Sequence, residues 1–552
     1  MKQSIQYLRM TVLVVLGAIL SSCEKEEPAQ PKDNVVVCTT SVSLDPEATK
    51  TLTEQGEKTF AEGDMIAVIY KNESSETVKA VSNPLPSGSY GHTATFSVTL
   101  VNPASNAAVR IIYPAEMAAS AVATDAEVSA DATINYEALA TQDGTLAGIS
   151  SHLDLAVYDG TLEGTVLPGN PALKNKLAIC EYTLKDNETT PNDITNTVSA
   201  LLVEDGTYSY YVSRTPAAGP IFVAIRPTVS ATIHYTAKTT SVWHVKTVTG
   251  KTYEANNFYP LGLRMTALPE GALPGLFTVI DDDSVTLHQA YFSKGNLQAE
   301  GTTASSPEGG WTWKFAENQW DCLGANGANK KVNGNGTIKE DGTVDLFGWS
   351  TDNADNYYGL NDDDTSNNGT GGKYGGNFKD WGEIMGLGWH TPSFLTSKLE
   401  YGEWRYIFYS RSASTLNGVD NALYAKANLF GTKHGVILFP DRYVHPTGVA
   451  QPTGINAGDA TSWNANAYSL EDWAKMEAAG AVFLPAAGYR NPASGGAALE
   501  GVQGYYWSST DYALDQAWDV RINDSAAPTG GTTSYVWYRK HGYSVRLIRY
   551  AD

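Results

Sequence analysis

Residues 95–100 read Thr-Phe-Ser-Val-Thr-Leu and alternate polar and apolar side chains without a break. Successive side chains of an extended strand point to opposite faces, so Phe96, Val98 and Leu100 share one face. The alternation predicts a half-buried β-strand. Comparable short apolar runs, separated by turn-forming residues, lie at 35–44, 65–70, 109–113, 153–158, 177–184 and 221–225.

These runs continue over about 230 residues, and no convincing long amphipathic helix interrupts them. Regular short strands with turns between them are typical of β-sandwiches. At this length they predict two sandwiches in tandem, which we place at residues 35–165 and 166–268.

Composition narrows the class of protein. The chain has 552 residues, 42% of them hydrophobic, which is enough for several cores and excludes wholesale disorder. Its formal net charge is −22 and it contains no Lys/Arg-rich run, which argues against binding to nucleic acid. Only 18% of the residues are charged, while Gly (51) and Tyr (31) are plentiful, a balance that favours an extracellular β-rich protein.

The first residues predict export. A basic start is followed by an apolar run at 10–20, which is too short to span a bilayer and fits a signal peptide at 1–22. The run ends in Ser-Ser-Cys23, which resembles the lipobox of bacterial lipoproteins. The resemblance implies an acylated (palmitate-bearing) Cys23, a polar tether at 23–34 and an outer-membrane location on a Gram-negative cell. The alternative is ordinary signal cleavage beside an incidental cysteine.

Three phrases in the first block resemble a known family. They are Phe-Ala-Glu-Gly-Asp at 60–64 followed by the run at 65–70, VRIIYPAE at 109–116 and YEANNFYPLGLRM at 253–265. Their order and spacing are similar to those of fimbrillin-like proteins, the pilus subunits of anaerobic Gram-negative bacteria. The resemblance implies two transthyretin-like sandwiches and assembly with other pilin subunits by donor-strand exchange.

In strand exchange a first strand is removed and a strand from another subunit fills the groove, so that unpaired backbone groups are satisfied again. Residues 35–44 (VVVCTTSVSL) are the candidate removable strand. Members of the family are commonly cut after a basic residue that follows, and the matching position here is Lys50 before Thr51. The alternative is an uncut strand in a lipid-anchored monomer.

The second block, residues 271–552, contains twelve of the thirteen tryptophans. Its phrases at 292–298, 313–320, 483–488, 505–510 (YYWSST) and 542–548 (GYSVRLI) resemble a C-terminal domain of bacterial surface lipoproteins. That domain is distantly similar to the C-type-lectin-like fold of formylglycine-generating enzymes. The resemblance implies a mixed α+β domain, and two helices are expected, one capped by Ser469 and one within 399–410.

We find no pattern that predicts catalysis. The sequence lacks GxSxG, HExxH, P-loop and GxGxxG motifs, and its nine histidines show no ligand spacing. Cys38, Cys180 and Cys322 are widely spaced, which disfavours a disulfide framework or a thiolate metal site. The sequence therefore predicts a protein that is not an enzyme.

A Gly/Asn/Asp-rich loop at 350–380 is the candidate binding site. Tyr357, Tyr358 and Tyr374 could cover the apolar face of a sugar ring, while Asn and Asp side chains satisfy its hydroxyls. Asp362 and Asp364 could serve Ca²⁺, although Gly375 stands where an EF-hand needs its bidentate Glu. We expect no cofactor beyond that candidate cation. The alternatives for this loop are a solvated segment and aromatic packing within the domain.

Together these features predict a fimbrial tip subunit. The first block would accept a donor strand, and the C-terminal domain would bind a glycan or a host or bacterial surface protein and prevent further extension. The alternative is a non-polymerising surface lipoprotein that captures polysaccharide for uptake.

Overall fold

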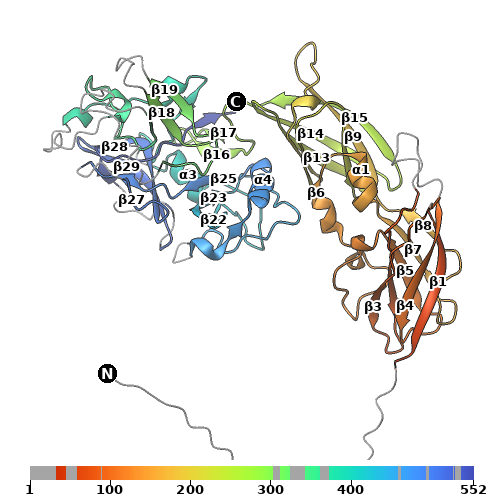
Figure 1. Ribbon diagram of the computed structural model, residues 1–552. Helices are drawn as coiled ribbons and strands as arrows, with labels where there is room; N and C mark the ends of the chain where they lie inside the picture. Colours follow the sequence, from red (N-terminus) through yellow and green to blue (C-terminus); the bar gives the residue numbers. More distant parts are fainter. Residues whose placement is uncertain are drawn as a thin grey trace, which may run out of the picture.

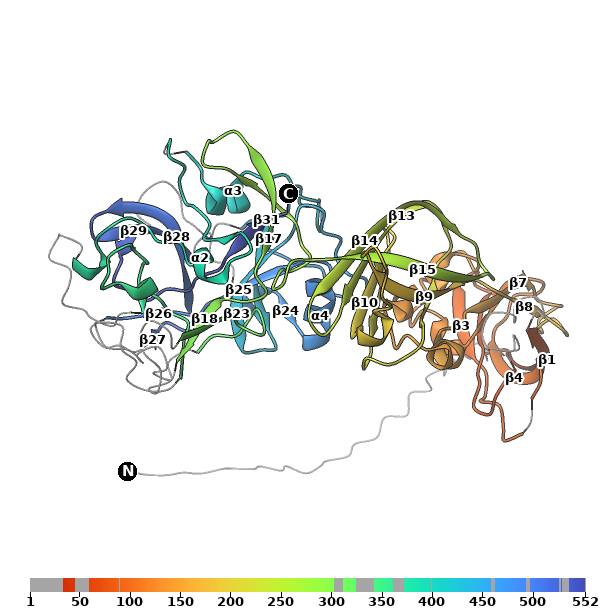
Figure 2. The same ribbon diagram turned by 90° about the horizontal axis from the view of Figure 1, so that it is seen from above.

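The computed structural model is mainly β, as the sequence predicts, and has three parts (Figure 1). It describes residues 33–44, 59–88, 90–301, 311–323, 342–360, 372–398, 400–457, 462–492, 497–525, 528 and 536–551. No helix within these ranges has the length and hydrophobicity that crossing a membrane requires. Seen from above, the C-terminal domain, the second sheet and the first sheet follow one another in a row (Figure 2).

The first part is a seven-stranded sheet with the order β3-β2-β5-β7-β8-β1-β4. Its strands are β1 Val35–Leu44, β2 Ala67–Lys71, β3 Thr77–Val81, β4 Thr93–Val101, β5 Ala108–Tyr113, β7 Ala156–Thr161 and β8 Ala172–Asn175. Phe96, Val98 and Leu100 on β4 are all buried in one core, which confirms the half-buried strand predicted at residues 95–100. Phe60 joins this core by packing edge-on against Phe96 and Tyr113.

The second part is an eight-stranded sheet with the order β12-β9-β15-β14-β13-β10-β11-β6. Its strands are β6 Thr141–Gln142, β9 Ala178–Asp186, β10 Ala200–Glu204, β11 Ser209–Ser213, β12 Ile221–Ile225, β13 Thr228–Lys238, β14 Trp243–Tyr253 and β15 Phe258–Ala267. A short helix, α1 Leu146–Gly148, lies beside this sheet.

The two sheets do not divide at residue 165, where the sequence analysis places the boundary. β6 comes before that point but pairs with β11 of the second sheet, and β8 comes after it but pairs with β7 and β1 of the first. The physical reason is that each sheet takes up a short strand from the other side of the expected boundary: β6 forms an edge of the second sheet, and β8 lies between β7 and β1 inside the first. The chain therefore passes between the two sheets more than once.

The C-terminal domain combines small sheets with short helices. Its strands are β16 Phe277–Ile280, β17 Leu287–Phe292, β18 Leu297–Gly301, β19 Trp311–Phe315, β20 Gly342–Val344, β21 Trp389–His390, β22 Tyr424–Leu429, β23 Lys433–Leu438, β24 Ala467–Tyr468, β25 Val482–Pro485, β26 Tyr489–Arg490, β27 Ala497–Ala498, β28 Gln503–Ala513, β29 Gln516–Asn523, β30 Val536–Tyr538 and β31 Ile548–Tyr550. Its helices are α2 Gly382–Met385, α3 Glu403–Tyr409 and α4 Leu470–Ala478.

Both helices expected in this domain form. Ser469 caps α4 through a capping box with Asp472, and α3 begins only after Gly402. Trp473 and Met476 on α4 are buried, whereas Leu470, the first residue of the helix, is exposed.

The second sheet and the C-terminal domain share one hydrophobic core. Leu202, Tyr211 and Trp243 from the sheet belong to the same buried cluster as Trp389 and Ala478 of the C-terminal domain. Polar contacts cross the same junction: Ser209 and Thr447 exchange two hydrogen bonds, and Lys238 Nζ lies 3.1 Å from Glu477 Oε2. These two parts therefore pack as one unit.

Candidate functional site

Strand β1 is hydrogen-bonded along both of its edges. On one side it pairs antiparallel with β4, from Val35 opposite Val101 to Ser43 opposite Thr93. On the other side the amides of Ser41 and Ser43 donate to the carbonyls of Gly169 and Pro171, each at 3.0 Å. Removing β1 would leave a groove bordered by unpaired backbone groups, the arrangement that recruits another strand.

The side chains of β1 alternate between core and solvent. Cys38, Thr40, Val42 and Leu44 point into the first core, whereas Val37 is exposed. The Thr40 hydroxyl donates to the carbonyl of Pro168 at 2.7 Å, so the polar side chain in this row is satisfied. Burial of side chains such as Val42 and Leu44 contributes about 1.5–3 kcal/mol each. The groove thus has specific pockets at alternate positions.

The predicted processing residues lie outside the described residues. This applies to Cys23, the lipidation candidate, and to Lys50 and Thr51, the candidate cleavage site. They remain predictions from the sequence.

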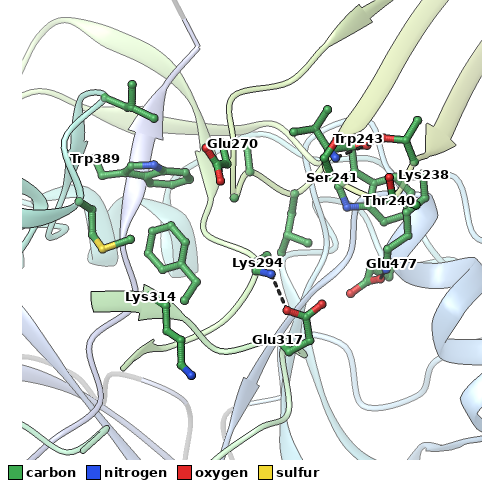
Figure 3. Close-up of a pocket in the computed structure, with 18 of the residues that line it drawn as sticks. Lys238, Thr240, Ser241, Trp243, Glu270, Lys294, Lys314, Glu317, Trp389 and Glu477 are labelled. Carbon is green, nitrogen blue, oxygen red and sulfur yellow. Dashed lines mark hydrogen bonds and ion pairs between the residues drawn. The ribbon is translucent and has the colours of Figure 1, made fainter. Parts of the chain in front are cut away.

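A second candidate site is a cleft of about 450 Å³ at the junction of the second sheet and the C-terminal domain (Figure 3). Trp389 lies on one side of the cleft, and the turn between β13 and β14, with Thr240 and Ser241, lies on the other. Glu270 lies between these two sides. The Lys294–Glu317 ion pair, 2.7 Å between Nζ and Oε2, borders the cleft below.

Aromatic side chains form much of the cleft wall. Phe315 packs edge-on against Trp389, with ring centroids 5.1 Å apart, and the half-buried Trp313 stacks on Phe347 at 5.5 Å. Lys238 Nζ lies 5.0 Å from the centre of the Trp243 ring. Rigid aromatic faces beside a few polar groups, in a volume of this size, are the usual composition of a small-molecule or sugar site.

The tyrosines predicted to bind a ligand differ in their exposure to solvent. Tyr357 and Tyr358 are half-buried in a 3₁₀-helix, Tyr357–Gly359, and Tyr358 packs against Trp313 with ring centroids 5.9 Å apart. Lys379 Nζ lies 4.2 Å from the centre of the Tyr358 ring. Tyr358 therefore lies next to Trp313 of the cleft wall. Its ring packs against Trp313 and Lys379 of the same domain.

Tyr374 cannot contact a ligand from solvent, so its predicted role is wrong. Its side chain is fully buried, and a Cβ added at Gly348 would lie 2.3 Å from the tyrosine ring. The reason is that the short 3₁₀-helix Gly372–Tyr374 turns the ring into the domain core. Asp362 and Asp364 lie outside the described residues. In the part of the chain that is described, no group of three or more His, Cys, Asp or Glu side chains could hold a metal ion.

The residues that form the cleft were not predictable from local sequence patterns. Trp243, Glu270, Lys294 and Trp389 come from segments far apart in the chain, and they meet only because the second sheet packs on the C-terminal domain. One signal was present: Trp243 is the single tryptophan before residue 271.

Comparisons with known proteins identify part of the C-terminal domain. Residues 457–548 match a family described as a domain of unknown function, DUF8237. No curated protein matches the chain.

Solved structures with similarity to the chain come from species of Parabacteroides and Bacteroides. A fimbrial assembly protein from Parabacteroides distasonis is 11% identical, with a TM-score of 0.25, over 47% of this chain and 96% of that one. A fimbrial protein from Bacteroides ovatus is 11% identical, with a TM-score of 0.22, over 94% and 99% of the two chains. A candidate polysaccharide-binding protein from Bacteroides thetaiotaomicron is 13% identical, with a TM-score of 0.24, over 36% and 76%.

Proposed function

We propose that the protein is a cell-surface fimbrial subunit in which a strand from another subunit replaces β1, and which binds a glycan or surface-protein ligand through its C-terminal domain. The observation that carries this proposal is the position of β1. It lies inside the first sheet, between β4 and β8, and its inward side chains complete the first core. A cut in the chain after β1 would leave it held by non-covalent contacts alone.

The pattern of β1 defines what a replacement strand must supply. It needs side chains of moderate size at four alternate positions, corresponding to Cys38, Thr40, Val42 and Leu44, and backbone groups free to pair with β4. At exposed positions such as that of Val37, the size of the replacement side chain is not restricted. Affinity then comes from the backbone hydrogen bonds, and specificity comes from the four pockets.

Strand β31 supports a place at the distal end of a fibre. It is paired on one side with β17 and on the other with β21, and Ile548 is fully buried. A donor strand must be free to leave its own domain, so β31 is unsuited to that role. The subunit would accept a donor strand from its neighbour but would not donate β31 to another subunit.

For the ligand we propose the cleft between Trp389 and the β13–β14 turn. Its aromatic walls and its Glu270 and Lys294 side chains suit the apolar faces and hydroxyl groups of a sugar. The protein would act by binding and not by catalysis. In the alternative function, a surface lipoprotein that captures polysaccharide, the same cleft would serve a monomer whose β1 stays in place.

Strand replacement is testable by cutting the full-length protein. A specific protease site placed at residues 48–53 allows cleavage after folding, and a fluorescent peptide with the sequence of residues 35–44 serves as the incoming strand. We expect the cut protein to take up the peptide and the uncut protein to exclude it, as measured by fluorescence anisotropy. A peptide with Asp in place of Thr40 and Val42 is the matched control and should not bind. Absence of uptake by the cut, folded protein would refute the proposal.

The ligand site is testable by glycan-array binding of the full chain. Glu270→Gln and Lys294→Gln alter polar groups of the cleft, and each should weaken binding about tenfold because a polar contact to the sugar is lost. Trp537→Ala removes an exposed aromatic ring that does not line the cleft, and it should leave binding unchanged. Loss of binding only in the Trp537 variant would place the site elsewhere in the C-terminal domain.

A further inference from the structure

A second cavity, of about 840 Å³, also lies at the junction between the second sheet and the C-terminal domain, and none of its lining residues lines the cleft beside Trp389. The sheet contributes residues of β10, β13 and β14 to its wall, and the C-terminal domain contributes residues 274–276, 440–442 and 444 together with Gln289 and Tyr291. No residue of this cavity belongs to the cleft or to the β1 groove described above.

Strand β10 brings a carboxyl group to this cavity. Leu201 and Val203 point into the core of the second sheet, whereas Ala200 and Leu202 point toward the C-terminal domain. Side chains alternate along a strand, so Glu204 lies on the same face as Ala200 and Leu202. It lines the cavity and is only 8% exposed.

The Glu204 carboxyl group has no counter-charge. Its Oε1 atom is buried without a hydrogen-bond partner, and within the described part of the chain no Lys, Arg or His forms an ion pair with it. Burial, together with a smaller effect of the nearby Asp205 carboxylate, raises its pKa to about 8. A buried carboxylate that is neither paired nor hydrogen-bonded is costly, so this position favours either a bound proton or a cationic partner.

The other charged groups around the cavity are engaged elsewhere or lie at its rim. Asp441 accepts hydrogen bonds from Arg411 at 2.9 Å and from the Thr278 amide at 2.8 Å. His234 bonds to the Thr247 hydroxyl at 2.9 Å, Arg442 is exposed, and Lys246 of β14, which also lines the cavity, is partly exposed to solvent. Of the charged side chains that line the cavity, Glu204 is therefore the buried one that forms no ion pair within the described part of the chain.

We propose that this cavity binds a ligand that carries a protonated amine on an apolar body, with the ammonium group paired to Glu204. The cavity wall offers apolar surface for such a body in Val245, Leu276, Tyr291 and Pro440. The volume is within the range of small-ligand pockets. The net charge of −22 favours the approach of cations over anions.

The test uses the full-length protein and two probes of the same shape. Cyclohexylamine is protonated at pH 8, whereas cyclohexanol is neutral. We expect cyclohexylamine to bind at least tenfold more tightly than cyclohexanol by isothermal titration calorimetry. Glu204→Gln should remove that difference, and Glu254→Gln, at an exposed carboxyl group directly after β14, should retain it.

A second readout does not depend on a variant. Carbon-13 NMR of the Glu side chains in the unmodified protein should show the Glu204 carboxyl group ionising at lower pH when cyclohexylamine is added, because the ammonium group stabilises the carboxylate. Equal binding of both probes, or a Glu204 titration that the amine does not shift, would overturn the proposal. In that event the cavity would hold only a protonated Glu204.

Discussion

At the scale of single residues, Glu204 makes the stability of the protein depend on pH. Burial raises its pKa from the ordinary value of 4.5 to about 8, so the folded protein keeps a proton that the unfolded chain releases. Its contribution to the free energy of unfolding is therefore complete below about pH 4.5 and is lost as the pH rises to about 8.

Replacing Glu204 with Gln should remove this dependence. We expect the variant to gain stability relative to the original protein between pH 5 and pH 8, as measured by urea unfolding without added ligand. Burial lowers the pKa of His234, His244 and His445, so these residues destabilise the fold only toward acid pH, and equally in both proteins. Parallel stability curves for the two proteins would contradict the prediction.

The role of a single residue was predictable from sequence where that role depends on a contact with a residue nearby in the chain. Ser469 and Asp472 are three positions apart, and their capping box forms as expected. Tyr374 and Glu204 were not predictable in this way, because their burial depends on segments distant in the chain. Nothing in the neighbouring sequence distinguishes a tyrosine that packs on Gly348 from one that faces solvent.

At the scale of elements, β1 offers a comparison between its two faces. Val42 is fully buried and Val37 is 68% exposed on the same strand. Val42→Asp places a charge in the first core and should lower the free energy of unfolding by more than about 3 kcal/mol. Val37→Asp should change it by less than about 0.5 kcal/mol. Equal effects in chemical denaturation would show that β1 does not sit in the core in solution.

Elements with one buried face can be recognised by their alternation. The predicted runs at 35–44 and 95–100 lie in β1 and β4, whose side chains alternate between core and solvent. The uninterrupted apolar run at 221–225 coincides with β12, which is buried along nearly its whole length. Strand β10 was not predicted; both of its faces are buried, one in each core, and its apolar residues follow one another in a pattern that periodicity cannot distinguish from a buried helix. The second face of β10 is buried only because the C-terminal domain packs on it, so the sequence of the strand does not alternate between polar and apolar residues.

At the scale of the whole molecule, the second sheet and the C-terminal domain should unfold together. Trp243 belongs to their shared core, and Trp243→Ala should cost about 3–5 kcal/mol at the junction. We expect differential scanning calorimetry to show one joint transition for these two parts in the original protein and two separate transitions in the variant. Trp537→Ala, at a residue 40% exposed, should retain the joint transition. A joint transition that persists in the Trp243 variant would contradict this expectation.

The arrangement of the parts was predictable only in outline. Composition and strand patterns indicated two β-rich units followed by a tryptophan-rich domain, but not that α4 would pack against the second sheet. Lys238 and Glu477 are far apart in sequence, so neither their ion pair nor the cleft beside it could be inferred from local patterns.

The antiparallel pairing of β1 with β4 also has a mechanical consequence. The ladder extends from Val35 to Ser43, and the strands of the first sheet run toward the second sheet (Figure 1). If a ligand holds the C-terminal domain while a tether pulls on the far end of the strand in the β1 position, the load acts along the strand axis. Tension in that direction shears the whole ladder at once instead of opening it one rung at a time, so many hydrogen bonds share the force.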